Sequence, residues 1–114
     1  MTKADFYKNK SLIATEWWLN AESLPDLVWA RLRVFSDGTA DACFVEGVTL
    51  YGFENREHAA NLLATDDLSR FSDWGGEEEE EEEYGISLAE IGPPTWVDPS
   101  DQDFVYSGTY PAPR

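Results

Sequence analysis

The fold is decided by residues 28–45, which read VWARLRVF-SDGT-ADACFV. Side chains in the first eight positions alternate between two faces, and a period of two is typical of a β-strand. One face holds Val28, Ala30, Leu32 and Val34, and the other holds Trp29, Arg31, Arg33 and Phe35. The Asp37-Gly38 pair that follows supplies the positive φ angles of a tight hairpin turn. These residues therefore predict a β-hairpin.

The return strand of the hairpin is predicted over residues 40–45. Its alternation places Ala42 and Phe44 toward the core and Asp41 on the outside. We expect Asp41 to form an ion pair with Arg31 or Arg33 across the two strands, at a contribution of ~0.2–1 kcal/mol.

Other segments extend the sheet on both sides of the hairpin. Further strands are predicted over residues 12–19, 48–53 and 104–110. In the first of these strands, Ile13, Thr15, Trp17 and Leu19 share one face. Residues 20–27 contain Pro25 and are expected to form a loop.

A helix is predicted after the third strand. Asn55 is a favourable N-cap, and the helix dipole favours Glu57 in the first turn. The apolar stripe of the helix is narrow and consists of Ala59, Leu62 and Leu63. We expect the helix to end near Thr65, with one more helical turn over residues 66–71 and a short second helix over residues 86–91.

These elements together predict one α+β domain that is mainly antiparallel β. The expected architecture is a curled sheet or partial barrel of about four or five strands with one main helix. A chain of 114 residues fits a single domain, here residues 1–114. Aromatic residues make up 14% of the chain, which argues against disorder of the whole chain.

The charge of the chain is strongly uneven. The formal net charge is −15, of which −4 belongs to residues 1–70 and −11 to residues 71–114. Seven consecutive acids lie in the second part: Glu77, Glu78, Glu79, Glu80, Glu81, Glu82 and Glu83. Because blocks of like charge are typically solvated or disordered, we interpret residues 75–84 as a flexible acidic loop.

Composition also excludes several classes of partner and location. The eight Lys and Arg residues are scattered, so the protein is not expected to bind nucleic acid or an anionic membrane surface. No apolar segment approaches transmembrane length, and because residues 1–10 lack the apolar region of a signal peptide, we expect none. Cys43 is the only cysteine, so the chain needs no oxidising compartment, and we expect a cytoplasmic protein.

No catalytic or metal-binding constellation stands out. The single histidine, His58, is interpreted as a neutral surface residue and Cys43 as a structural thiol. The sequence does not exclude a catalytic Cys–His pair between them. With one Cys and one His, the chain lacks the usual set of zinc ligands. The acidic residues within 98–103 do not have the spacing of a calcium-binding loop. We therefore expect no catalytic residue, no metal and no cofactor.

The aromatic and acidic residues are the candidates for binding. Exposed aromatics beside arginine are typical of interaction hot spots, and an acidic run suits a basic partner. The candidates for partner binding are Trp18, Trp29, Arg31, Arg33, Phe35 and the glutamates from Glu77 to Glu83. The sequence favours a non-enzymatic protein-interaction module whose partner is a basic protein or a second copy. The alternative is a small-ligand-binding β-barrel with weak enzymatic activity, its pocket lined by aromatics.

One stretch of the sequence also resembles a known group of proteins. The sequence over about residues 11–70 resembles that of small acidic uncharacterised proteins of cyanobacteria. The similarity lies in residues 16–19, 24–32, 37–38 and 51–54. The resemblance implies a cytoplasmic protein and carries over no active-site residue.

Overall fold

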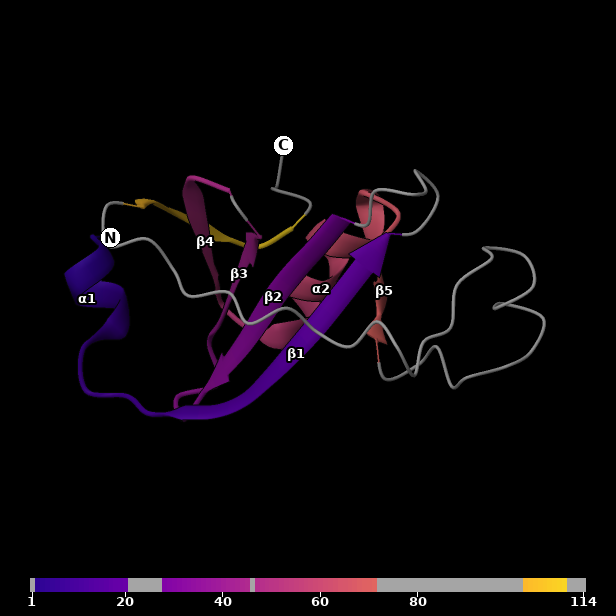
Figure 1. The fold of residues 1–114 in the computed structure, drawn as a ribbon. Coiled ribbons are helices and arrows are strands. Elements are labelled where there is room, and N and C mark those ends of the chain that lie inside the picture. The colour runs from indigo at the N-terminus through magenta and orange to yellow at the C-terminus, as the bar shows by residue number, and fades with distance from the viewer. Residues whose placement is uncertain (1, 21–27, 46, 72–101, 111–114) are drawn as a thin grey trace, which may run out of the picture.

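The structure is a computed structural model that describes residues 2–20, 28–45, 47–71 and 102–110 (Figure 1). In chain order the elements are α1 (Lys3–Tyr7), β1 (Leu12–Asn20), β2 (Val28–Phe35), β3 (Ala40–Phe44), β4 (Thr49–Phe53), α2 (Arg56–Thr65), β5 (Ser69–Arg70) and β6 (Asp103–Gly108). The predicted loop over residues 20–27, the acidic loop and the short helix over residues 86–91 lie outside the described residues, apart from Asn20, which ends β1.

The strands form one open sheet in the order β5-β1-β2-β3-β4-β6. Neighbouring strands are antiparallel except β4 and β6, which run parallel. The α+β class with a curled, mainly antiparallel sheet and one main helix is thereby confirmed. The parallel pairing of β4 and β6 follows from the connection between them. This connection is a crossover that includes α2, and parallel neighbours need a connection of this kind.

The hairpin of β2 and β3 forms as predicted but has a different turn. Arg33 lies opposite Asp41, and Val34 lies opposite Ala40. Gly38 has φ +88°, whereas Asp37 does not adopt a positive φ. The amide of Gly38 donates to the carbonyl of Phe35, which closes a four-residue turn over residues 35–38. Gly38 then forms a β-bulge at the start of the return strand. The prediction of positive φ at both Asp37 and Gly38 was wrong, and only the glycine needs it.

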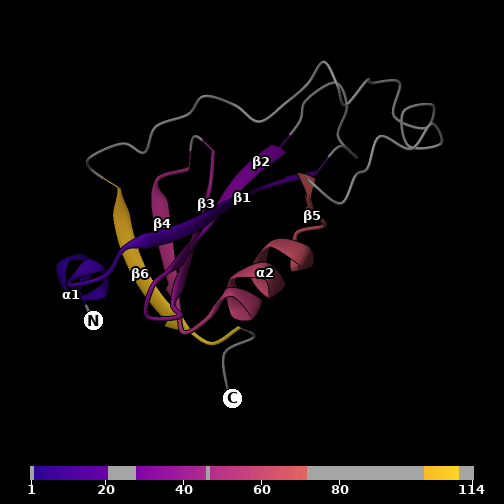
Figure 2. The same ribbon diagram turned by 90° about the horizontal axis from the view of Figure 1, so that it is seen from below.

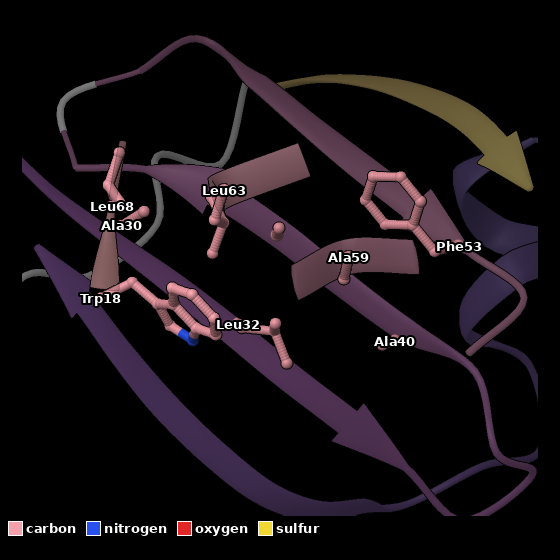
Figure 3. Packing of buried hydrophobic residues seen from close by; sticks show 9 residues of the cluster. Trp18, Ala30, Leu32, Ala40, Phe53, Ala59, Leu63 and Leu68 are labelled. Atoms are coloured by element: carbon pink, nitrogen blue, oxygen red, sulfur yellow. The ribbon is translucent and has the colours of Figure 1, made fainter. Parts of the chain in front are cut away.

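Helix α2 packs on one face of the sheet, called here the helix face (Figure 2). It begins as predicted, with the Asn55 side chain accepting a hydrogen bond from the amide of His58. Figure 3 shows Ala59 and Leu63 of α2 facing Trp18, Leu32 and Phe53 of the sheet. Because a ten-residue helix is marginal alone, this burial holds it in place, at roughly 1.5–3 kcal/mol for each large side chain.

Helix α2 ends as predicted at Thr65, but the chain then turns back to the sheet instead of continuing as a helix. Asp67 has φ +63°, and the amide of Leu68 donates to the carbonyl of Leu63, as in a Schellman motif. Leu68 is thereby buried in the core beside Leu63. The expected helical turn over residues 66–71 is wrong, since Ser69 and Arg70 pair with β1 as strand β5.

The opposite face of the sheet is called here the arm face, because the N-terminal arm with α1 packs on it. Phe6 of α1 contacts Phe35, Phe104 and Tyr106 with ring centroids 5.2–6.2 Å apart. Helix α1 was missing from the prediction, although Thr2 and Asp5 form a complete capping box at its start. Within the described parts of the chain, no helix has the length and apolar character needed to span a membrane.

Candidate functional site

Within the part of the chain that the structure describes, the outer edge of β1 is paired over only part of its length. Strand β2 pairs with β1 from Leu12 to Asn20, whereas β5 pairs only with Trp18 and Leu19 on the other side (Figure 1). Among the described residues, no strand lies outside Ala14–Trp17. Backbone groups at such an edge are a template for another strand.

Exposed aliphatic side chains mark the beginning of this edge. Leu12 is 52% exposed and Ile13 is 66% exposed, which makes Ile13 the most exposed large apolar residue of the strand. A β-bulge lies here, because Leu12 and Ala14 face consecutive residues of β2 and Ile13 is the extra residue. The predicted alternation of β1 therefore holds from Thr15 onward and is broken at Ile13. Bulges re-aim side chains and limit pairing at sheet edges.

A hollow of about 210 Å³ adjoins the edge, lined by Thr15, Glu16, Trp17, Arg70 and Phe71. We call it the edge hollow. Strand β5 ends at Arg70, opposite Trp18, and Phe71 leaves the ladder. The edge hollow therefore lies beside Trp17, at the end of the ladder that β5 forms with β1.

The carboxylate of Glu16 at the edge hollow is paired with two arginines. Glu16 accepts hydrogen bonds from Arg56, with the Nη2 to Oε1 bond at 2.7 Å, and lies 3.8 Å from Nη1 of Arg70. The hydrogen bonds from Arg56 are the main cause that lowers the pKa of Glu16. The Glu16 carboxylate at this edge is therefore compensated by two guanidinium groups.

Aromatic side chains support the edge hollow from the arm face. Trp17 packs edge-on against Trp29 at 6.5 Å between ring centroids, and Trp29 packs against Phe71 at 5.5 Å. All three side chains are half-buried. Of the predicted binding residues that the structure describes, Trp29 is thus the one that lies next to this site.

Three other predicted binding residues, Arg31, Arg33 and Phe35, lie deeper on the arm face. Asp41 is fully buried and accepts hydrogen bonds from Arg33, with Nε to Oδ1 at 3.0 Å and Nη2 to Oδ2 at 2.5 Å. Nη2 of Arg31 lies 3.9 Å from the same carboxylate. The predicted ion pair is confirmed, but Asp41 is buried and not outside.

Tyr7 and Lys10 close this network from the N-terminal arm. The Tyr7 hydroxyl donates to Oδ2 of Asp41 at 2.6 Å, and burial, followed by the charge of Asp41, raises the pKa of Tyr7. The ammonium of Lys10 lies 3.5 Å from the centroid of the Phe6 ring and 5.1 Å from that of Phe35. These contacts fix α1 on the sheet.

The remaining predicted residues do not gather at one site. Trp18 is buried in the core of the helix face, and Arg31 and Phe35 are also buried. The glutamates from 77 to 83 lie outside the described residues. The sequence reasoning did not select Glu16, Arg70 or Phe71, because the edge hollow forms only when β5 docks on β1.

Cys43 and His58 lie on opposite faces of the sheet, so they do not form a catalytic pair. Cys43 is fully buried next to Arg31, and burial raises the pKa of its thiol. His58 lies on α2, where its Nδ1 accepts a 3.0 Å hydrogen bond from the amide of Tyr110. In the part of the chain that the structure describes, no three His, Cys, Asp or Glu side chains are grouped to hold a metal ion.

Comparison of the chain with protein-family models, with curated proteins and with solved structures finds no match in any of the three. The candidate site is therefore assigned from its geometry alone.

Proposed function

We propose that the protein is a non-enzymatic interaction module that binds an extended protein segment along the edge of β1. The observation that carries this proposal is the edge from Ala14 to Trp17, which no described strand covers and which lies directly beside the edge hollow. Strand addition of this kind derives affinity from backbone hydrogen bonds and specificity from pockets for alternate side chains. The edge of β1 supplies the first, and the edge hollow supplies the second.

The acidic part of the chain has a separate role in the proposal. The described residues carry nine acids and seven bases, a net charge of −2, so −13 of the total lies on the other residues. We propose that the run from Glu77 to Glu83 attracts a basic partner, and that the edge of β1 then holds it. Such attraction accelerates association and weakens as salt increases.

The test is capture of partners from a cell lysate by immobilised wild-type protein and two variants. Ile13→Asp places a charge on the edge, whereas Val48→Asp places the same charge at the most exposed large apolar side chain that the structure describes, on the β3–β4 turn. The proposal requires a protein that wild type and Val48→Asp retain and Ile13→Asp loses. It also requires that the purified partner slow hydrogen exchange of the amides from Ala14 to Trp17. Equal capture by all three proteins would contradict it.

A second candidate function is binding of a small ligand, which the edge hollow itself favours. Its walls combine two aromatic rings, Trp17 and Phe71, with the guanidinium of Arg70. Because the sheet is open, such a ligand would lie at the sheet edge and not inside a barrel. Ligand screening by chemical shifts of the Trp17 indole, with Trp17→Leu as control, separates this function from strand addition.

A further inference from the structure

We propose that the edge hollow binds a small aromatic carboxylate, with the carboxylate at Arg70 and the ring beside Trp17 and Phe71. This inference rests on the second candidate function, the binding of a small ligand, and names the chemical class of that ligand. The edge hollow is lined by both kinds of side chain that such a ligand needs, a guanidinium group and aromatic rings.

The two sides of the edge hollow differ in chemistry because they come from opposite faces of the sheet. Arg70 lies opposite Trp18 in the ladder, and facing residues of neighbouring strands share a face, so Arg70 belongs to the helix face. Glu16 shares this face with Trp18, two positions along the same strand. The rings of Trp17 and Phe71 pack on the arm face instead. A ligand that contacts both sides therefore has a polar end and an apolar end.

The charged side of the edge hollow favours an anion. Among the described residues, Glu16 contributes one negative charge to it, whereas Arg56 and Arg70 contribute two positive charges. Glu16 accepts a 2.7 Å hydrogen bond from Nη2 of Arg56, while Nη1 of Arg70 lies 3.8 Å from it and the Arg70 side chain is 37% exposed. Guanidinium groups bind carboxylates through paired N–H donors. An amine at this place would instead add a third positive charge.

The size of the edge hollow limits the ligand to a single ring. A protein cavity of about 150 Å³ accommodates benzene, whereas pockets for drug-sized ligands measure about 300–1,000 Å³. The volume of the edge hollow, about 210 Å³, lies between these sizes and suits one benzene ring with a short carboxylate arm. Trp17 and Phe71 present ring edges and faces to such a ligand. Inorganic phosphate would leave the aromatic side unfilled.

The charge of the whole chain sets the conditions of the experiment. The chain carries −15 and therefore repels anions at low ionic strength. At about 0.15 M salt the screening length is about 8 Å, so the guanidinium groups at the edge hollow then act on a bound carboxylate more strongly than distant acids do. Binding is therefore measured at this ionic strength.

Three probes on the wild-type protein test the charge and the ring separately. Phenylacetate carries both, phenylacetamide has the same shape without the charge, and acetate has the charge without the ring. Each titration is followed by the Nε1–H signal of Trp17, which is identified by its loss in Trp17→Leu. We expect phenylacetate to saturate the shift of this signal with a dissociation constant of about 1 mM, and the other two probes to bind at least about tenfold more weakly.

A matched pair of variants assigns the anion to Arg70. Arg70→Gln removes the guanidinium that lines the edge hollow. Lys8→Gln makes the same change of charge at the exposed end of α1, and Figure 1 shows α1 and β5 at opposite ends of the sheet. We expect Arg70→Gln to weaken binding of phenylacetate about tenfold or more and to leave phenylacetamide unchanged, while Lys8→Gln has little effect on either. Equal effects of the two variants on phenylacetate overturn the assignment.

The comparison of probes on the wild-type protein does not depend on the folding of a variant. If phenylacetamide binds as tightly as phenylacetate, the preference for an anion is overturned, and the edge hollow remains a site for small ligands. If acetate binds as tightly as phenylacetate, the role of the aromatic rings is overturned. If neither ring compound shifts the Trp17 signal, ligand binding at the edge hollow is overturned as a whole, and strand addition along β1 is unaffected.

Discussion

The hydroxyl of Tyr7 donates a 2.6 Å hydrogen bond to the carboxylate of Asp41, 34 positions further along the chain. This bond joins the short helix α1 to the centre of the sheet. Asp41 is fully buried and also receives the guanidinium of Arg33. One carboxylate therefore holds together the N-terminal arm and the central hairpin.

We predict that Asp41→Asn destabilises the protein by about 3 kcal/mol or more, because it leaves two arginines without their buried counter-charge. Urea unfolding at neutral pH measures the change. The matched control is Asp37→Asn, four residues earlier in an exposed turn, which should cost less than about 1 kcal/mol. Equal costs for the two variants would show that the buried network contributes little.

Tyr7→Phe should change how stability depends on alkaline pH. Because burial and Asp41 raise the pKa of Tyr7, its ionisation is disfavoured in the folded state. The corresponding stability is fully present below the ordinary tyrosine pKa of about 10 and is lost as the pH rises above it. The free energy of unfolding should therefore fall less in Tyr7→Phe than in wild type between about pH 9 and pH 11. Parallel curves for the two proteins would contradict this assignment. Cys43 is present in both proteins and cancels in the comparison.

Local sequence signals predicted most of the elements that the structure describes. The alternation of residues 28–35 predicted the hairpin of β2 and β3, and the N-cap at Asn55 predicted the start of α2. Both signals involve only residues that are close together in the sequence. The burial of Asp41 could not be read from alternation, which assigns a face to a side chain but does not reveal what covers that face. Helix α1 covers Asp41. Its capping box of Thr2 and Asp5 can be recognised in the sequence, but the helix has only five residues.

The parts of the candidate site that the sequence did not predict depend on long-range docking. Strand β5 has two residues, too few for any periodicity, and it forms because the chain reverses after α2. The reversal uses a positive φ at Asp67, where sequence reasoning expects glycine. Without β5 there is no edge hollow, so the site could not be found from composition or spacing.

Asp67→Gly should stabilise the protein by up to about 1 kcal/mol. Asp67 has φ +63°, a conformation that glycine adopts without the steric cost of a side chain. Asp66→Gly is the control, since Asp66 has φ −91° and glycine there only adds freedom to the unfolded chain. Thermal or urea unfolding should show opposite signs for the two variants, and a loss of stability in Asp67→Gly would mean that its carboxylate has a role of its own.

Glu16→Gln should destabilise the protein at neutral pH and have little effect in acid. Arg56 lowers the pKa of Glu16, so the stabilisation is present above the ordinary value of 4.5 and disappears as the pH falls through the lower folded value. Because the pair is partly solvated, the expected loss at neutral pH is at most about 1 kcal/mol. The exposed carboxylate of Asp103 on β6 provides the control, Asp103→Asn. A difference between wild type and Glu16→Gln that persists undiminished in acid would exclude the ion pair as its cause.

Gly52→Ala should destabilise the protein through the docking of α1 and the strand β6. A Cβ atom at Gly52 would lie 2.8 Å from Cζ of Phe104 and 2.9 Å from Cε2 of Phe6, closer than packed atoms allow. Overpacking of this kind costs about 1–3 kcal/mol.

A double-mutant cycle with Phe6→Leu identifies the cause of this cost. The smaller side chain removes one of the two close approaches, so Gly52→Ala should cost less in the Phe6→Leu protein than in wild type. Gly38→Ala is the control: it meets no atom within 4 Å and is disfavoured only by φ +88°, so its cost should be the same in both proteins. Additive costs for Gly52→Ala and Phe6→Leu would mean that the arm yields freely, and that Phe104 alone sets the need for glycine at this position.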